Sequence, residues 1–343
     1  MKKLLNTLYI TNPDAYLSKY NDNIVVSIDG KEVGTFPIHI FRQIVCFNYT
    51  GLSPALMKLA MEKNINITFF TPYGNFCGRV VGKSFGNIYV RKKQYKLCDG
   101  EQSLEFVRNI IYAKAYNSKK VLIRSKNDHK YKIDVVRIEK AIDNINSSMQ
   151  ELKIAQNKDS IRGIEGNIAR EYFSVLDELI LKQREDFYMV GRSKRPPKDR
   201  FNALISFMYS VYTNEIAAAL EGVGIDSYAG FFHTDRPGRV SMALDIIEEF
   251  RSIIIDKFCL SLINLNKINK HHFEMKENGA SLLNKKGREI VLGKWKEKED
   301  EEIYHYYLEE KIKIGLLAHV QAQLLNSYIQ EEIPSYPPYM QKG

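Results

Sequence analysis

The chain is poor in the residues that mark cross-linked and membrane-spanning proteins. Its 343 residues include only four cysteines and one tryptophan. The cysteines are far apart and form no C-x-x-C pair, so the sequence favours reduced thiols in the cytoplasm over a disulfide framework or a zinc ribbon. No apolar run approaches the roughly 20 residues that a membrane span needs. These absences predict a cytoplasmic protein without a membrane segment.

An excess of positive charge is the first feature that points to a partner. The chain has 50 Lys and Arg residues against 41 Asp and Glu residues, a formal net charge of +9. A basic balance favours an anionic partner such as nucleic acid. A soluble protein with a lysine-rich surface explains the same balance equally well.

The first hundred residues predict a small β-rich domain. Ile24 to Ile28 and Val33 to Phe36 flank the hairpin turn signal Asp29-Gly30, and Ile40 to Phe47 is another strand candidate. Ser53-Pro54 supplies the N-cap and the first-turn proline of a helix. We expect a sandwich-like β domain over residues 1–98.

Helical periodicity dominates the rest of the chain. The predicted helices are Leu104 to Tyr116, Val135 to Ile154, Ile161 to Leu181, Phe201 to Leu220, Ser241 to Leu262 and Ile303 to Ile329. The charged segment Arg91 to Lys96 is expected to be a linker or the end of a strand, and the proline-rich end from Pro334 a wrapped or frayed tail. The sequence thus predicts an α+β fold, with a larger all-α domain over residues 99–343.

One predicted helix carries an unusual glutamate. Glu165 stands between Gly163 and Gly166, at the edge of an apolar stripe through Ile164 and Ile168. Each glycine costs about 1 kcal/mol relative to alanine inside a helix. We therefore predict that something approaches the helix backbone beside Glu165. The simpler interpretation is a glutamate on a solvated helix face.

Two further segments offer partners for this glutamate. His233 lies in a loop with Arg236 and Arg239, and Asp245 and Glu248 are three residues apart on one helix face. Two carboxylates and an imidazole suit Mg²⁺ or Mn²⁺, which would stabilise a phosphodiester transition state. The arginines would hold phosphate oxygens. A loop histidine is more often not a ligand, and Asp245 with Glu248 is more often a surface pair, so spacing alone leaves the metal site a hypothesis.

A basic segment follows the Glu165 helix. Between residues 182 and 200 it carries Arg192, Lys194, Arg195 and Lys198 around Pro196-Pro197, which oppose a continuous helix. A flexible basic segment in this place suits contacts to DNA phosphates. A solvated linker between helices is the alternative.

Four segments, in this order, resemble a known family. They are Glu165 to Ala169, then Arg195 to Asp199 leading into Asn202 to Phe207, then Gly230 to His233, and finally Ser241 to Arg251. Together with Asn6 to Tyr9 and Tyr49 to Leu56, they resemble the CRISPR-associated endonuclease/integrase, the larger subunit of the spacer-acquisition complex. They are most similar to its members from type I, subtype C systems. The resemblance covers nearly the whole chain, and its one noted departure, Arg200 where a proline is expected, puts no chemistry in doubt.

The resemblance implies a role in antiviral defence and a set of partners. It implies a homodimer, with the N-terminal domain as the dimerisation domain, and a complex with the small companion subunit of the adaptation machinery. Its metal ligands fall on Glu165, His233 and Glu248, and Asp245 matches a further acidic position beside them. The implied reaction is attack by the 3′-hydroxyl of a short DNA fragment on a phosphodiester at the CRISPR repeat. The same site would hydrolyse double-stranded or branched DNA when water replaces the hydroxyl.

Two rival functions remain open from the residues alone. A non-catalytic DNA-binding scaffold of the same adaptation complex shares the basic charge and needs no metal. A hydrolase of small phosphorylated substrates is a weaker rival, because the sequence has no glycine-rich phosphate loop.

Overall fold

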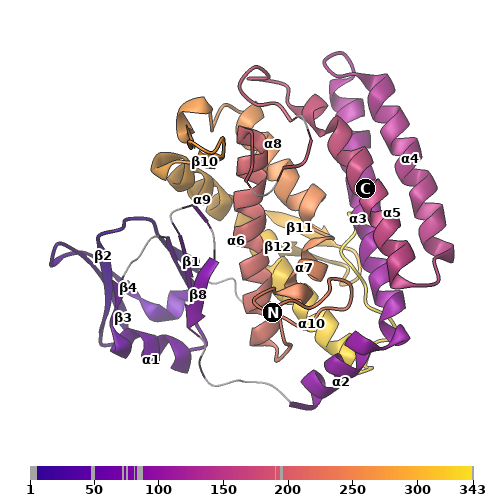
Figure 1. Ribbon diagram of the computed structural model, residues 1–343. Coiled ribbons are helices and arrows are strands. Elements are labelled where there is room, and N and C mark those ends of the chain that lie inside the picture. The colour runs from indigo at the N-terminus through magenta and orange to yellow at the C-terminus, as the bar shows by residue number, and fades with distance from the viewer. Residues whose placement is uncertain are drawn as a thin grey trace.

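The computed structural model describes residues 6–47, 51–71, 73–74, 76–80, 82, 88–189, 191–193 and 196–341. Figure 1 shows a β-rich N-terminal part beside a larger helical part that surrounds the long helix α6. The expected α+β fold, with the β-rich part first, is confirmed.

The N-terminal part consists of two sheets and one helix. Its strands are β1 (Asn6–Ile10), β2 (Ala15–Tyr20), β3 (Asn23–Ile28), β4 (Lys31–Pro37), β5 (Phe41–Phe47), β6 (Gly51–Leu52), β7 (Asn66–Phe70) and β8 (Phe76–Val80). They form two four-stranded sheets, ordered β1-β5-β7-β8 and β4-β3-β2-β6. Leu17 from one sheet, Ile44 and Ile67 from the other and Leu56 from α1 (Pro54–Glu62) meet in a single buried core.

The local signals in this part have the structures that the sequence predicts. Asp29 and Gly30 both have positive φ, 51° and 75°, as the tight turn of a two-residue hairpin requires. Ser53 caps α1 by accepting a hydrogen bond from the Leu56 N–H at 3.2 Å, and Pro54 takes the first helical position.

Helices build most of the second part. The longer ones are α2 (Ile88–Asp99), α3 (Leu104–His129), α4 (Val135–Ile154), α5 (Lys158–Val175), α6 (Arg200–Gly222), α9 (Lys285–Glu299) and α10 (Leu317–Ile329). Shorter turns are η1 (Ile38–Ile40), η2 (Glu101–Ser103), η3 (Leu176–Leu179), η5 (Lys270–His272) and η6 (Ile314–Leu316). Two small antiparallel pairs, β9 (Phe273–Met275) with β10 (Ser281–Leu283) and β11 (Glu302–His305) with β12 (Glu310–Lys313), complete it.

The predicted helix from Ser241 to Leu262 is interrupted. The structure divides it into α7 (Ser241–Ile247), the π-helical segment η4 (Arg251–Asp256) and α8 (Lys257–Asn264). A π-helical turn widens the helix and shifts the side chains that follow it, and such turns often occur at functional sites. Glu248 lies at this junction as the C-cap residue of α7.

Two other predictions for secondary structure were wrong. Ile303 to Ile329 is not one helix, because its first part forms the β11–β12 hairpin and only α10 is helical. The tyrosines there favour a strand, and Glu309 turns the chain with a φ of 55°. Arg91 to Lys96 is neither linker nor strand but lies within α2, where Gln94 is fully buried and donates to the carbonyls of Asp226 and Ala229, both at 2.8 Å.

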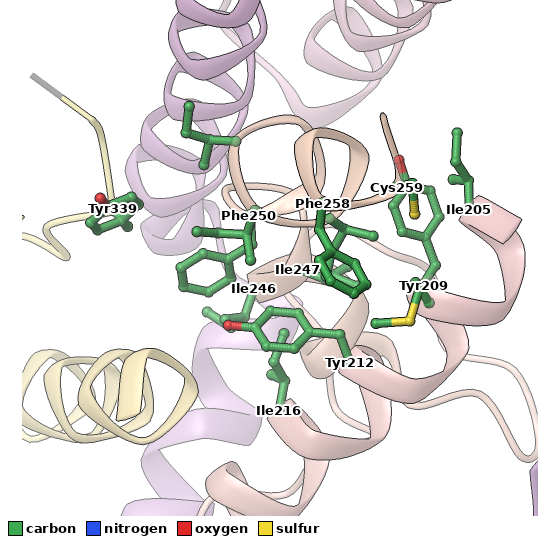
Figure 2. Packing of buried hydrophobic residues seen from close by; sticks show 14 of the residues in the cluster. Ile205, Tyr209, Tyr212, Ile216, Ile246, Ile247, Phe250, Phe258, Cys259 and Tyr339 are labelled. Carbon is green, nitrogen blue, oxygen red and sulfur yellow. The ribbon is translucent and has the colours of Figure 1, made fainter. Parts of the chain in front are cut away.

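The core of the helical part lies along α6. Figure 2 shows Tyr212 and Ile216 of α6 facing Ile246 and Phe250, with Phe258 of α8 beside them. Tyr339 reaches the same core from the C-terminal tail, with its ring 5.9 Å from that of Phe250. The tail is therefore wrapped onto the domain.

The two parts of the chain contact each other through both apolar and charged groups. The ring of Phe47, at the end of β5, lies 5.8 Å from that of Phe207 on α6. Arg42 on β5 bonds to the buried carboxylate of Glu299. Arg79 on β8 meets Glu221 of α6 at 2.5 Å. Among the described helices, none is both long and apolar enough to cross a membrane.

Candidate active site

Glu165, His233, Asp245 and Glu248 come together at one place in the fold. Glu165 projects from α5, where Ile164 and Ile168 bury the helix against the core and leave Glu165 at the edge of the stripe. Its side chain is 23% exposed. His233 lies in the loop before α7, and Asp245 and Glu248 lie on α7 and at its end. The spacing of these residues in the sequence left a shared site a hypothesis. In the structure the four side chains are neighbours.

Asp245 fixes both the loop and the imidazole. Its fully buried carboxylate accepts hydrogen bonds from the backbone N–H groups of Phe231, Phe232 and His233 at 2.7, 3.0 and 2.9 Å. The same carboxylate lies 2.7 Å from His233 Nδ1. Because a carboxylate only accepts, Nδ1 carries a proton, and in the neutral imidazole the lone pair is then on Nε2. This arrangement orients metal-binding histidines in many proteins.

Glu248 is the most buried of the candidate ligands. It is 4% exposed, and its Oε1 lies 3.9 Å from His233 Nε2 and 3.0 Å from Arg251 Nε. Burial alone would raise its pKa, but Arg251, Lys114 and His233 together hold the pKa well below its usual range. These neighbouring cations favour the carboxylate form of Glu248 despite its burial.

Lys114 is a member of the site that the sequence analysis missed. It lies on α3, is 8% exposed, and its Nζ bonds to Glu165 and lies 2.7 Å from Glu248 Oε2. Burial opposes the charge of Lys114, yet Glu248 and Glu165 outweigh it and raise the pKa of the ammonium. The available signal was its spacing, because Ile110, Lys114, Asn117 and Val121 share one buried stripe of α3.

The donor groups suit a divalent cation, although Lys114 now stands among them. Within the described part of the chain, no three His, Cys, Asp or Glu side chains are arranged to hold a metal as they stand. Lys114 Nζ lies between Glu165 and Glu248, in contact with both carboxylates. Glu248 Oε2 is buried, and the charged group of Lys114 lies beside it, with Nζ at 2.7 Å. Two carboxylates and a free imidazole nitrogen are ligands that Mg²⁺ and Mn²⁺ accept.

The basic residues that the sequence proposed for DNA contact divide into three groups. Arg192 is an internal residue, since its guanidinium donates to the Ser193 carbonyl at 2.6 Å and to Asn202 Oδ1 at 2.7 Å. Lys198 and Arg236 are exposed, and Arg239 is partly exposed on the His233 loop. Lys194 and Arg195 lie outside the described residues.

The surface around Glu165 is open and partly basic. Gly163 and Gly166 are exposed, and a Cβ placed on either would meet no other atom within 4 Å. Packing against the described residues therefore does not explain these glycines. Arg162, one turn before Glu165, donates to the carbonyl of Phe232 at 3.2 Å and so brings a guanidinium beside the His233 loop.

A family model for "CRISPR associated protein Cas1" matches residues 8–297 of this chain. The chain belongs to the Cas1 family. It is 40% identical over 341 residues to the CRISPR-associated endonuclease Cas1 1 of Chlorobaculum tepidum, which covers 99% of each chain. It is 37% identical over 346 residues, the whole of both chains, to the CRISPR-associated endonuclease Cas1 2 of Rhodospirillum rubrum. The resemblance to this family is confirmed, whereas the subtype within it stays a prediction.

Solved structures share the fold. A Cas1 protein from Thermotoga maritima matches with a TM-score of 0.81 at 22% identity, over 98% of this chain and all of the other. A casposase bound to integration product matches with a TM-score of 0.83 at 18% identity, over 98% and 95% of the two chains. A chain of a Cas6-RT-Cas1–Cas2 complex also matches with a TM-score of 0.83 at 18% identity, over 100% of this chain and 37% of that one. At these identities the likeness establishes the Cas1 fold.

Proposed function

We propose that this chain is a divalent-metal-dependent DNA endonuclease and integrase that inserts short DNA fragments into CRISPR arrays. The Cas1 relatives named as endonucleases support the activity. The observation that carries the proposal is the meeting of Glu165, His233 and Glu248 from three separate segments, with His233 Nε2 free because Asp245 holds Nδ1.

Each residue of the site has a defined task in this function. Glu165, His233 Nε2 and Glu248 would hold Mg²⁺ or Mn²⁺, which when bound neutralises charge on a phosphodiester and activates a hydroxyl or water. Asp245 positions the imidazole and ties the His233 loop to α7. Arg251 keeps Glu248 ionised. A 3′-hydroxyl as the nucleophile gives strand transfer, and water gives hydrolysis.

DNA would approach from the open side of α5. Arg162, Arg236 and Arg239 lie on that side and on the His233 loop, where they would meet phosphates. Lys198 is an exposed candidate on the basic segment, and Lys194 and Arg195 stay predictions from the sequence. Arg192 is not included, because its bonds are internal.

A homodimer that also binds the small companion subunit is part of the proposal. The support for a dimer is β4, an edge strand of the N-terminal part along which Val33 and Phe36 are exposed. A solved complex that contains Cas1 and Cas2 supports the companion subunit.

We propose the N-terminal domain as the dimerisation domain. We propose that this domain ends before α2, rather than at residue 98, because α2 bonds to the loop after α6.

The location proposed is the cytoplasm, where the buried thiols of Cys46 and Cys259 stay reduced.

An assay with branched DNA separates this function from that of a non-catalytic DNA-binding scaffold. Purified protein is incubated with a labelled branched duplex and a CRISPR-array target, with Mg²⁺, Mn²⁺ or EDTA, and with or without the companion subunit. The enzyme cleaves or joins strands only when a metal is present, and the Glu165→Gln variant binds the DNA without cleaving it. Metal-independent binding with no cleavage by the unmodified protein would establish the scaffold.

A further inference from the structure

Lys114 is a buried ammonium group that the proposed chemistry does not use. It lies on the buried face of α3 that also carries Ile110, Asn117 and Val121, and it is 8% exposed. An isolated buried ammonium is costly unless it is paired with opposite charge. Its Nζ is paired with Glu165 and Glu248, the two carboxylates proposed to bind the metal. The lysine therefore occupies the cation position between the two proposed ligands.

Lys114 and Arg251 already offset the charges of the two proposed metal ligands. Lys114 and Arg251 carry two positive charges, and Glu165 and Glu248 carry two negative charges. The buried carboxylate of Asp245 adds one more negative charge beside His233. Adding a dication to these five groups leaves a surplus of one positive charge in a place that is mostly buried. A phosphodiester brings one negative charge and offers the released ammonium a new partner.

We propose that Lys114 is an internal counter-ion that competes with the divalent cation for Glu165 and Glu248, and that a DNA phosphate draws its Nζ away when the metal enters. The inference rests on the proposed function, because it takes these carboxylates as the metal ligands. Metal and DNA binding are then coupled, and each raises the affinity for the other by the same factor. Without DNA, the lysine holds the two carboxylates in place and keeps metal affinity low.

Isothermal titration with Mn²⁺ and no DNA tests the competition directly. Lys114→Met keeps the length of the side chain and removes the charge, so its Mn²⁺ affinity should rise by about tenfold or more. Lys114→Arg keeps the charge, and the guanidinium can form two parallel hydrogen bonds to a carboxylate. The Mn²⁺ affinity of this variant should therefore fall. Lys120→Met is the matched control, because Lys120 is on the same helix but lies over the ring of Tyr116. Its Mn²⁺ affinity should equal that of the unmodified protein.

A second titration contains DNA that resists cleavage. In the unmodified protein this DNA should tighten Mn²⁺ binding several-fold, and in Lys114→Met it should tighten it much less. If Lys114→Met folds poorly, the loss of affinity in Lys114→Arg and the DNA effect in the unmodified protein still test the proposal.

The outcomes separate this inference from the proposed function. Unchanged or weaker Mn²⁺ binding by folded Lys114→Met, with binding abolished in Glu165→Gln, would overturn the counter-ion and leave the metal site standing. Mn²⁺ binding that survives in both Glu165→Gln and Glu248→Gln would overturn the metal site itself and the counter-ion with it.

Discussion

The carboxylate of Asp245 lies 2.7 Å from Nδ1 of His233, and the same carboxylate accepts three backbone N–H groups of the loop that carries this histidine. One buried side chain therefore sets the position of the loop and the tautomer of the imidazole. Asp245 acts on the site through His233 and does not need to touch a metal.

Replacing Asp245 with asparagine should weaken metal binding without removing a ligand. The amide is uncharged and holds the Nδ1–H tautomer less firmly, so we expect Mn²⁺ affinity to fall about 10- to 100-fold. Titration with Mn²⁺ measures this change, and ¹⁵N NMR of the imidazole reports the tautomer. Asp235→Asn, on the exposed part of the same loop, is the control. An unchanged tautomer and an unchanged affinity would remove Asp245 from this role.

Replacing Gly166 with alanine should stabilise the protein but weaken DNA binding. Among the described residues, the new methyl group meets no atom from outside its own helix backbone within 4 Å, and alanine is favoured over glycine inside a helix by about 1 kcal/mol. The methyl group would, however, obstruct DNA that approaches α5 beside Glu165. Gly293→Ala is the control, since Gly293 is exposed on α9 and its Cβ also meets nothing.

Denaturant unfolding and DNA titration are compared for the two glycine variants. Both should gain similar stability, and only Gly166→Ala should lose DNA affinity. Equal DNA affinity for both would mean that α5 is not approached closely at Gly166.

The stability of the protein should fall between about pH 4.5 and pH 8 through Glu215. Burial, with the nearby Glu299, raises the pKa of Glu215 from 4.5 to about 8, while Arg42, Trp295 and Tyr9 lower it. As the pH rises, the unfolded chain thus releases the proton of Glu215 at a lower pH than the folded protein does. The associated stability is complete below the unfolded pKa and is lost as the pH rises through the folded pKa.

Glu215→Gln removes this titration and should flatten the fall in unfolding free energy over that range. The change in unfolding free energy over this pH range should differ between the two proteins by on the order of 5 kcal/mol. Urea unfolding at several pH values measures it, and Glu139→Gln, at an exposed position on α4, is the control. If the pH dependence of Glu215→Gln matched that of the unmodified protein, the raised pKa would be wrong.

Arg236 and Arg192 should respond differently to substitution. Loss of one phosphate contact in Arg236→Gln weakens DNA binding at all sequences and reduces the salt slope by about 1. Arg192→Gln should leave the slope unchanged and lower the melting temperature, because it removes bonds to Ser193 and Asn202. Binding isotherms at several salt concentrations, together with thermal melts, check both. If the salt slope fell for Arg192→Gln and not for Arg236→Gln, Arg192 would be the residue that contacts a phosphate.

Local sequence patterns predicted the correct elements where neighbouring residues supply the hydrogen-bond partners of the backbone. The Asp29-Gly30 turn, the Ser53 cap and the helix from Val135 to Ile154 depend on neighbours within a few residues, so the sequence predicts them. The hairpin at Glu302–Lys313 and the π-helical segment Arg251–Asp256 depend on what packs against them. Periodicity alone could not separate these from ordinary helices.

The sequence by itself determined the family, the two-part order of the fold and the identity of Glu165, His233, Asp245 and Glu248 as candidates, because ordered motifs and side-chain chemistry are written along the chain. Only the tertiary structure decided that these side chains meet, that Asp245 serves His233, that Arg192 is internal and that Lys114 stands between two carboxylates. The physical reason is distance along the chain. Residues 114, 165 and 248 share no local pattern, and packing of α3, α5 and α7 brings their charges together.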